Sequence, residues 1–344
     1  MLSIYRKGIT EKLCNEYCEG FTDEKGVFIE GMLFWIKKRI NRELVTNLHK
    51  LKNRKNNKDI NSFKALMTDD KIREILTGNP QSLLDIWTNE FEIFRDSKIE
   101  VKKVYNQKIT YKSVKLIYHI FNYDSFRDIS AKNIFSGFIL AKKLGIECCP
   151  YCNRNYTTTH AMYKGKKVFP EFDHFYHKTN YPLLSVSFYN LIPSCNVCNT
   201  HFKGSKDSVK TEIFHPYKEV ILDHFKFKFI PNNVESMYGD KDNFTLDFSY
   251  VDLANKKNIE KSIEFFGLKE IYEICHSSLI KEIVNKKLTY SNKYLHVIKD
   301  MYGISFEESY RILFETYYEE DRLHERPFSK LKKDIFDDVN ILSK

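Results

Sequence analysis

Two Cys-x-x-Cys pairs constrain this chain more than any other feature of its sequence. Cys149 and Cys152 form the first pair and Cys195 and Cys198 the second, with 42 residues (153–194) between them. Two thiolates at this spacing can bind one ion from a tight turn, and two such pairs complete the four-sulfur tetrahedron of structural zinc. The separation exceeds the roughly 15–20 residues of a plain zinc ribbon. We therefore expect a structural Zn²⁺ that frames a substantial insertion.

The other cysteines lack this pairing. Cys148 directly precedes Cys149 but should face away from the ion, so it is expected to be packed or free. Cys14, Cys18 and Cys275 are expected to be buried thiols. The chain starts without the apolar core of a secretory signal, which favours the cytoplasm, where cysteines serve as thiols or metal ligands rather than disulfides.

An Asp-His pair and two asparagines accompany the cysteine frame. Asp173, His174 and Asn190 lie between the two pairs, and Asn199 directly follows Cys198. Phosphodiester hydrolysis needs an activated water, a cation near the phosphate and stabilisation of the departing oxygen. Asp and Asn supply the oxygen ligands that a hard ion such as Mg²⁺ prefers, and an imidazole with a pKa of about 6.5 suits the base. Since neighbouring strand residues point to opposite faces, one of the pair can reach the ion while the other is held for the water.

Positive charge is concentrated around this frame. The formal net charge is +9; residues 141–210 hold ten Lys/Arg against four Asp/Glu, and residues 50–58 add five positive charges and no acid. This pattern suits a polyanionic partner such as nucleic acid, although a generally Lys- and Asn-rich composition is an alternative explanation of the charge alone. A hydrophobic content of 42% excludes a disordered chain, and a mean hydropathy of −0.47 argues against a membrane span.

The pattern along the chain predicts an α+β protein in three parts. Residues 1–140 are expected to form a helical N-terminal domain, in which Ser82 caps a helix. Residues 141–210 form the cysteine-framed module, and residues 211–344 form a strand pair followed by a helical C-terminal domain.

Within the central module we expect two strands, an ordered loop and a short helix. The stretches 155–163 and 166–172 flank a Lys-Gly-Lys turn and are predicted to pair as strands. Residues 175–194 are predicted to form a loop, and a short helix is expected from Asn196 to near Gly204. In the third part, residues 224–230 and 244–250 alternate apolar and polar side chains, which predicts the strand pair.

The complete ordered pattern resembles the HNH endonuclease family with its ββα-metal fold. The pattern runs Cys149-x-x-Cys152, Asp173-His174, Asn190-Leu191, Cys195-x-x-Cys198-Asn199 and Lys203-Gly204. The resemblance covers about residues 140–206 and implies a central HNH module whose four cysteines bind a structural Zn²⁺.

The resemblance also implies roles for four residues. His174 is the general base, Asp173 and Asn199 bind the catalytic divalent ion, Mg²⁺ or another, and Asn190 bonds the loop backbone and orients the base. Two features depart from the family pattern. Asn199 stands where a His is common, and His177 stands where Pro is expected, as a second titratable group near the phosphate.

Other polar residues of the module are weaker candidates. Lys178, His201 and Lys203 are candidates for phosphate contact, while Tyr151 is expected to be a packing residue. His215, farther along, is expected to be structural.

Within the HNH family, the sequence most resembles bacterial defence-associated proteins of Septu and retron type, which work beside an ATPase of the ABC or AAA class. This implies a nuclease of an anti-phage system that acts on DNA, most simply double-stranded, with an ATPase subunit as partner. Two alternatives stay open: RNA as the substrate, and a non-catalytic, zinc-stabilised subunit that binds nucleic acid or serves as a scaffold. Only the nuclease requires the Asp-His pair and Asn199.

Overall fold

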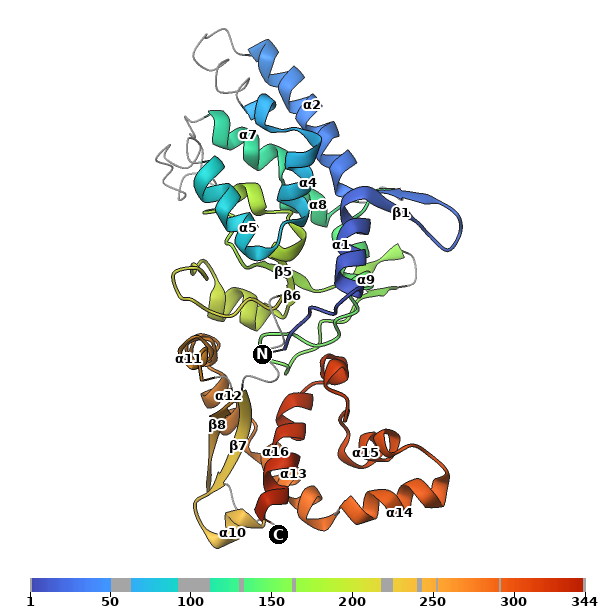
Figure 1. The fold of residues 1–344 in the computed structure, drawn as a ribbon, viewed down its shortest axis with the longest axis vertical. Coiled ribbons are helices and arrows are strands. Elements are labelled where there is room, and N and C mark those ends of the chain that lie inside the picture. The colour runs from blue at the N-terminus through green and yellow to red at the C-terminus, as the bar shows by residue number, and fades with distance from the viewer. Residues whose placement is uncertain are drawn as a thin grey trace.

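The computed structural model describes residues 2–50, 63–91, 112–129, 133–162, 165–217, 225–239, 243–251, 253–290 and 292–342. Its described part is mainly helical and contains four two-stranded antiparallel sheets, which confirms the α+β class (Figure 1). Beyond Lys50, the basic run to residue 58 lies outside the described residues. None of the described helices has the length and apolar character needed to cross a membrane.

The first part of the chain is helical, as predicted. Its helices are α1 (Ile9–Glu19), α2 (Met32–Lys50), α4 (Asp69–Thr77), α5 (Pro80–Asp85), the π-helix η1 (Ile86–Glu90), α7 (Lys112–Ile120), α8 (Tyr123–Arg127) and α9 (Gly137–Leu144). A hairpin of β1 (Gly20–Thr22) and β2 (Phe28–Glu30) was not predicted, because three-residue strands are too short to display an alternation. The predicted Ser82 cap is wrong. Asn79 caps α5 by accepting a bond from the Ser82 backbone N–H at 2.9 Å, and Pro80 occupies the first helical turn, where its missing N–H has no consequence.

Two small sheets lie inside the cysteine frame. The first joins β3 (His160–Ala161) to β4 (Lys167–Val168), which confirms the predicted strand pair in a shorter form. The second joins β5 (Glu171–His174) to β6 (Leu191–Ser194), so the prediction that residues 175–194 are loop throughout is wrong for the last four. Pro193 argued against a strand in the sequence because proline has no backbone N–H to donate. It is tolerated in β6 because each strand of a two-stranded sheet is an edge strand.

The segment between β5 and β6 contains only two short 3₁₀ turns, η4 (Pro182–Leu184) and η5 (Phe188–Asn190). The helix expected after Asn196 is confirmed as η6 (Val197–Lys203), which has π-helical geometry. The Gly204 N–H closes it on the Asn199 carbonyl at 2.8 Å, and Gly204 has a φ of +50°, a conformation in which glycine is not strained.

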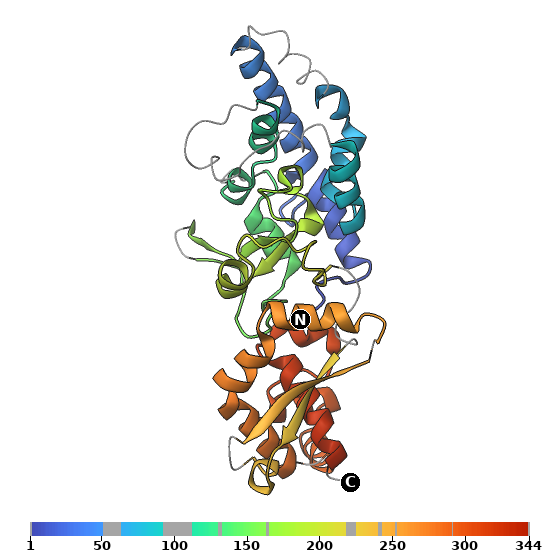
Figure 2. The same cartoon turned by 90° about the vertical axis from the view of Figure 1, so that its left-hand side faces the viewer.

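The predicted strand pair of the third part is confirmed as β7 (Phe225–Pro231) and β8 (Phe244–Tyr250). Buried apolar side chains, mostly phenylalanines, alternate along both strands, and α16 (Ser329–Leu342) packs on β7, where Asp334 accepts the Phe227 N–H at 3.0 Å. The helices are α10 (Val234–Met237), α11 (Lys256–Phe265), α12 (Leu268–Cys275), α13 (Ser277–Thr289), α14 (Asn292–Tyr302), α15 (Phe306–Phe314), the 3₁₀ helix η8 (Glu320–Glu325) and α16 (Ser329–Leu342). Figures 1 and 2 show these elements gathered at one end of an elongated molecule.

The first cysteine turn, Cys149 to Asn153, is bonded to the C-terminal part of the chain. Asn153, in the left-handed region with a φ of +49°, donates through Nδ2 to the carbonyls of Leu323 and Arg326 and accepts the Lys330 N–H through Oδ1. Tyr151 stacks on Phe266, the residue that caps the C-terminus of α11 (Lys256–Phe265), with ring centres 4.4 Å apart. The cysteine frame therefore contacts the C-terminal helices as well as enclosing the central sheet.

Candidate metal centre and candidate active site

The four cysteines of the two pairs come together in one buried cluster. The Sγ atoms of Cys149, Cys152, Cys195 and Cys198 all lie within 4.8 Å of one another, and Cys152 Sγ is 3.9 Å from Cys195 Sγ. A tetrahedral zinc with Zn–S bonds of about 2.3 Å requires sulfurs about 3.8 Å apart. The donor set and its spacing therefore fit Zn²⁺.

Nitrogen donors around the cluster favour thiolates. The backbone N–H of Arg154 donates to Cys152 Sγ at 3.4 Å, and the Asn155 side-chain amide donates to Cys195 Sγ at 3.3 Å. A hydrogen bond from the Cys149 thiol lowers the pKa of the Cys152 thiol to about 7; the Cys198 thiol acts in the same direction, and Cys195 and burial act in the opposite one. These groups stabilise the deprotonated ligands that a metal requires.

The remaining cysteines lie outside this cluster. Cys148 is buried and packed, as expected, and burial raises the pKa of its thiol to about 12. Cys14 and Cys18 are buried, but the prediction for Cys275 is wrong, because it lies exposed at the end of α12. The residues of α12 that face the core are Leu268 and Tyr272.

The Asp173 carboxylate is buried and has two partners. Its Oδ1 lies 2.8 Å from Lys203 Nζ, and its Oδ2 accepts the Tyr151 hydroxyl at 2.6 Å. Lys203 also donates to the backbone carbonyl of His174. Since Tyr151 belongs to the first cysteine turn and Lys203 to η6, the two cysteine-bearing segments converge on this carboxylate.

The His174 imidazole is buried and held in a defined orientation. Its Nε2 lies 2.9 Å from the Ser185 carbonyl, and its ring meets the Tyr123 ring edge-on at 4.4 Å between centres. Burial, then the nearby Lys178 ammonium, place the pKa of His174 well below its usual range, so the ring is neutral. A carbonyl can only accept, so the proton is on Nε2 and Nδ1 keeps a lone pair, for which the described residues provide no hydrogen-bond partner.

Asn190 connects the segments that surround this histidine. Its Oδ1 accepts the Tyr176 N–H at 2.6 Å, and its Nδ2 donates to the carbonyls of Tyr176 and Leu184 at 3.1 and 2.7 Å. Leu184 precedes Ser185, whose carbonyl binds His174. The fully buried Asn190 amide thus holds the loop in place, and the Ser185 carbonyl of that loop orients the His174 imidazole.

One cavity of about 170 Å³ brings these candidates together. Asp173 and His174 of β5 and Asn199 of η6 all line it. Asn199 is half-buried and donates through Nδ2 to Glu171 at 2.8 Å, which leaves its Oδ1 as an acceptor. The cavity therefore presents an imidazole nitrogen and carboxylate and amide oxygens, the donor types that suit a hard divalent ion and its water.

The three phosphate-contact candidates lie in different settings. Lys178 is half-buried in the cavity wall, 3.4 Å from Asp124. His201 is exposed on η6 and does not line the cavity. Lys203 is fully buried in its ion pair, and it does not present its ammonium to solvent.

His177 also lines the cavity, with its Nδ1 2.6 Å from the Thr179 hydroxyl. Burial, followed by the charge on Lys203, lowers the pKa of His177. Four further wall residues were not predicted: Glu171, Phe172, Tyr123 and Arg127. Glu171 was detectable, because it precedes Asp173 by two positions on one strand and so shares its face. Tyr123 and Arg127 come from α8, and no sequence signal links α8 to this site.

Together, the fold and the cluster define a mainly helical α+β protein with a buried four-cysteine site of zinc-binding geometry. The chain is similar over a short stretch to the Septu protein PtuB of Bacillus thuringiensis, with 43% identity over 56 residues. That stretch covers 16% of this chain and 21% of the Septu protein, so the match spans about a fifth of this relative. No family model matches the chain, and no solved structure matches it.

Proposed function

We propose that this protein is a metal-dependent endonuclease of the HNH type that hydrolyses phosphodiester bonds of DNA, most simply double-stranded DNA. The observation that carries the proposal is the single cavity lined by Asp173, His174 and Asn199 beside a four-cysteine cluster. The short similarity to a Septu protein supports a role in anti-phage defence. The cytoplasm as location and an ABC- or AAA-class ATPase as partner are part of the proposal through the family resemblance of the sequence alone.

In this proposal His174 is the general base. Its Nε2–H bond to the Ser185 carbonyl directs the Nδ1 lone pair away from that loop, so Nδ1 can take a proton from a water in the cavity. A neutral imidazole is required for this step, and burial keeps the ring neutral. Asn190 acts as a positioning residue, because it holds the loop and does not line the cavity.

Asp173 and Asn199 are the residues that would hold a divalent ion such as Mg²⁺ through oxygen atoms. When bound, such an ion neutralises phosphate charge and stabilises the departing oxygen. Glu171 holds the Asn199 amide nitrogen, which leaves the amide oxygen available. Lys178 and the exposed Arg127 supply positive charge at the cavity wall for the phosphate.

A second function is favoured by one specific observation. Both oxygens of Asp173 already have partners, Lys203 and Tyr151, and an ion pair can replace a metal at a carboxylate. This arrangement suits a non-catalytic subunit that binds nucleic acid through a zinc-stabilised surface. The two functions differ in whether His174 matters for cleavage.

The test is nicking of supercoiled plasmid in Mg²⁺ by the full chain, isolated with any subunit that copurifies. We expect His174→Ala to lower the rate by about 10²- to 10⁴-fold, the usual contribution of a general base, while zinc content stays that of the wild type. His160→Ala, which changes an exposed histidine on β3, is the matched control and should cleave normally. Equal cleavage by His174→Ala and wild type would favour the non-catalytic subunit.

A further inference from the structure

A second, larger cavity lies beside the site described above. It has a volume of about 840 Å³, within the range of pockets that bind small molecules. His174 lines the smaller cavity, whereas the next two residues, Phe175 and Tyr176, line the larger one. No residue lines both, so the two cavities are separate sites joined by one short stretch of chain.

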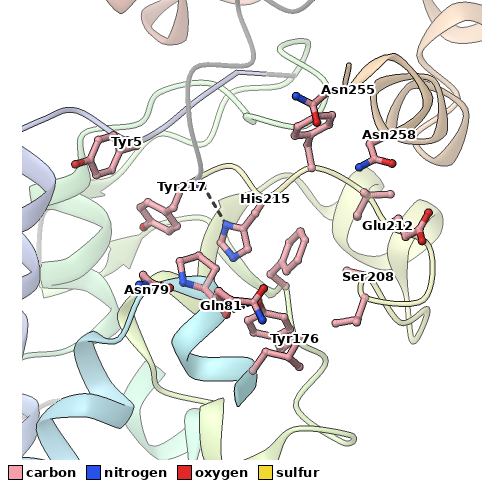
Figure 3. A pocket seen from close by; sticks show the side chains of 16 residues that line it. Tyr5, Asn79, Gln81, Tyr176, Ser208, Glu212, His215, Tyr217, Asn255 and Asn258 are labelled. Carbon is pink, nitrogen blue, oxygen red and sulfur yellow. Dashed lines mark hydrogen bonds between the residues drawn. The ribbon is translucent and has the colours of Figure 1, made fainter. Parts of the chain in front are cut away.

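Aromatic rings form much of its buried wall. Phe175, Tyr176 and Tyr217 are buried there together with His215, whose ring centre lies 4.0 Å from that of Phe175. The His215 Nδ1 accepts the Tyr217 N–H at 3.2 Å, so the neutral ring carries its proton on Nε2 (Figure 3). Flat rings of this kind provide stacking surfaces for a planar ligand.

Side-chain amides surround these rings. Figure 3 shows Asn79 and Gln81 approaching from α5, and Asn255 and Asn258 from the start of α11. Gln81 donates its Nε2 to Asp85 at 3.0 Å, which leaves its Oε1 as an acceptor. The side chain of Asn258 makes no hydrogen bond with the described residues, so its amide offers a donor and an acceptor side by side.

Ser208 adds a buried polar atom without a partner. Its side chain is 1% exposed, and its hydroxyl forms no hydrogen bond within the described part of the chain. A buried hydroxyl without a partner carries a free-energy cost that a bound ligand can remove. This hydroxyl therefore points to an occupant with hydrogen-bonding groups.

The charges identify the kind of occupant. Among the described residues that line the cavity there is no Lys or Arg, and the carboxylate of Glu212 is ion-paired with Lys261 outside it. Phosphate or another anion would therefore find no cation in this wall. A neutral, planar ligand with a hydrogen-bonding edge fits better.

We propose that this cavity binds a nucleobase, stacked on the aromatic wall and hydrogen-bonded at its edge by Asn258 and Gln81. Amide side chains recognise the edges of bases, and aromatic rings stack on their faces. The base can arrive as a free nucleoside or as an unpaired base of a nucleic-acid strand. The inference goes beyond the proposed cleavage, since binding a base requires neither His174 nor a divalent ion.

The test is calorimetric titration of the full chain, without added Mg²⁺, with the four deoxynucleosides and uridine. In parallel, a mixed-sequence single-stranded oligonucleotide is compared with its counterpart containing abasic sites. Two variants probe the cavity: Asn258→Ala, which removes the amide, and Leu84→Trp, which fills the space from the half-buried wall residue Leu84. Glu264→Ala, at an exposed position of α11, is the matched control, and thermal unfolding verifies that each variant folds.

We expect the wild type to bind at least one nucleoside, or the intact oligonucleotide alone. Both variants should bind that ligand about 10-fold more weakly than the wild type, because one loses one or two hydrogen bonds and the other loses the space for a ring. Nucleoside binding identifies a free ligand; binding of the intact but not the abasic oligonucleotide identifies a strand. His174→Ala should bind as the wild type does, which separates this test from the test of cleavage. The proposal is overturned if no base-dependent binding occurs or if both variants bind as tightly as the wild type.

Discussion

Lys203 Nζ lies 2.8 Å from Asp173 Oδ1, and the two side chains are 0% and 3% exposed. A buried carboxylate and ammonium stabilise the fold only as a pair, because each alone carries a large desolvation cost. The pair joins η6 to β5, and the Tyr151 hydroxyl joins the first cysteine turn to the same carboxylate. The centre of the module is therefore an ion pair within a frame of four cysteines.

Removing the ammonium should destabilise the protein strongly. Lys203→Met keeps most of the side-chain volume but leaves Asp173 buried and unpaired, so we expect the free energy of unfolding to fall by about 3–5 kcal/mol. Urea denaturation measures the change. Lys37→Met breaks the exposed pair with Asp69 and should change the free energy by less than about 1 kcal/mol. Similar small losses in both variants would show that the buried pair does not hold the module together.

Loss of one zinc ligand should unfold the centre rather than produce a folded, inactive protein. Cys195→Ser removes one of four sulfurs, and binding of a structural metal is coupled to folding. We expect the variant to lose its zinc and to show no cooperative thermal unfolding transition. Elemental analysis of the purified chain provides the measurement. Cys148→Ser, next to the first ligand but outside the cluster, should retain its zinc.

Replacing the Asn190 amide by a carboxyl group of the same shape should destabilise the protein. Asn190→Asp keeps an acceptor for the Tyr176 N–H but turns a second oxygen towards the carbonyls of Tyr176 and Leu184. We expect a loss of about 2–4 kcal/mol in stability, from two acceptors left without donors, with zinc retained. Chemical denaturation of this variant, with the exposed Asn180→Asp as control, measures it. A neutral effect would mean that the loop is held by other contacts.

Two substitutions at Asn153 should separate hydrogen bonding from backbone strain. Both Asn153→Ala and Asn153→Gly remove the side-chain bonds to η8 and α16. Only alanine is strained at a φ of +49°, so it should be less stable than the glycine variant by about 1 kcal/mol. Thermal unfolding compares the two, and limited proteolysis should release the C-terminal helices earlier in both. Equal stability of the wild type and both variants would show that the Asn153 side chain does not hold the C-terminal helices to the first cysteine turn.

The buried His174 should make the fold sensitive to mild acid. Its pKa in the folded protein is well below the usual value of about 6.5 that it regains on unfolding, so the unfolded chain binds the extra proton. Stability is therefore full above pH 6.5 or so and falls as the pH drops below it. His174→Gln should show a weaker fall than the wild type between roughly pH 6.5 and 5. Parallel slopes would mean that this ring contributes nothing to the pH dependence.

The zinc cluster was predictable because its ligands follow a local spacing rule, and the order of Asp173, His174, Asn190 and Asn199 around it pointed to one site. The structure brings Asp173, His174 and Asn199 to one cavity and leaves Asn190 behind the loop. Lys203 was less predictable. A lysine on a short helix is usually solvated, and only the packing of three separate segments shows that it is buried.

The sequence was least informative about elements whose structure depends on residues far away along the chain. Strand β6 was obscured by Pro193, and its pairing with β5 is visible only in the fold. The walls of the large cavity come from stretches as far apart in the sequence as Tyr5 and Asn258, so no local pattern indicated it. No sequence feature distinguishes its aromatic residues from ordinary core side chains.

Chemical rescue tests the central claim most directly, since it asks whether the His174 imidazole itself takes part in cleavage. His174→Ala is assayed on plasmid in Mg²⁺ with and without added imidazole, next to Asn199→Ala. We expect imidazole to restore part of the lost cleavage in His174→Ala and none in Asn199→Ala, whose missing group is an oxygen ligand. Cleavage by His174→Ala at the wild-type rate without imidazole would contradict this expectation.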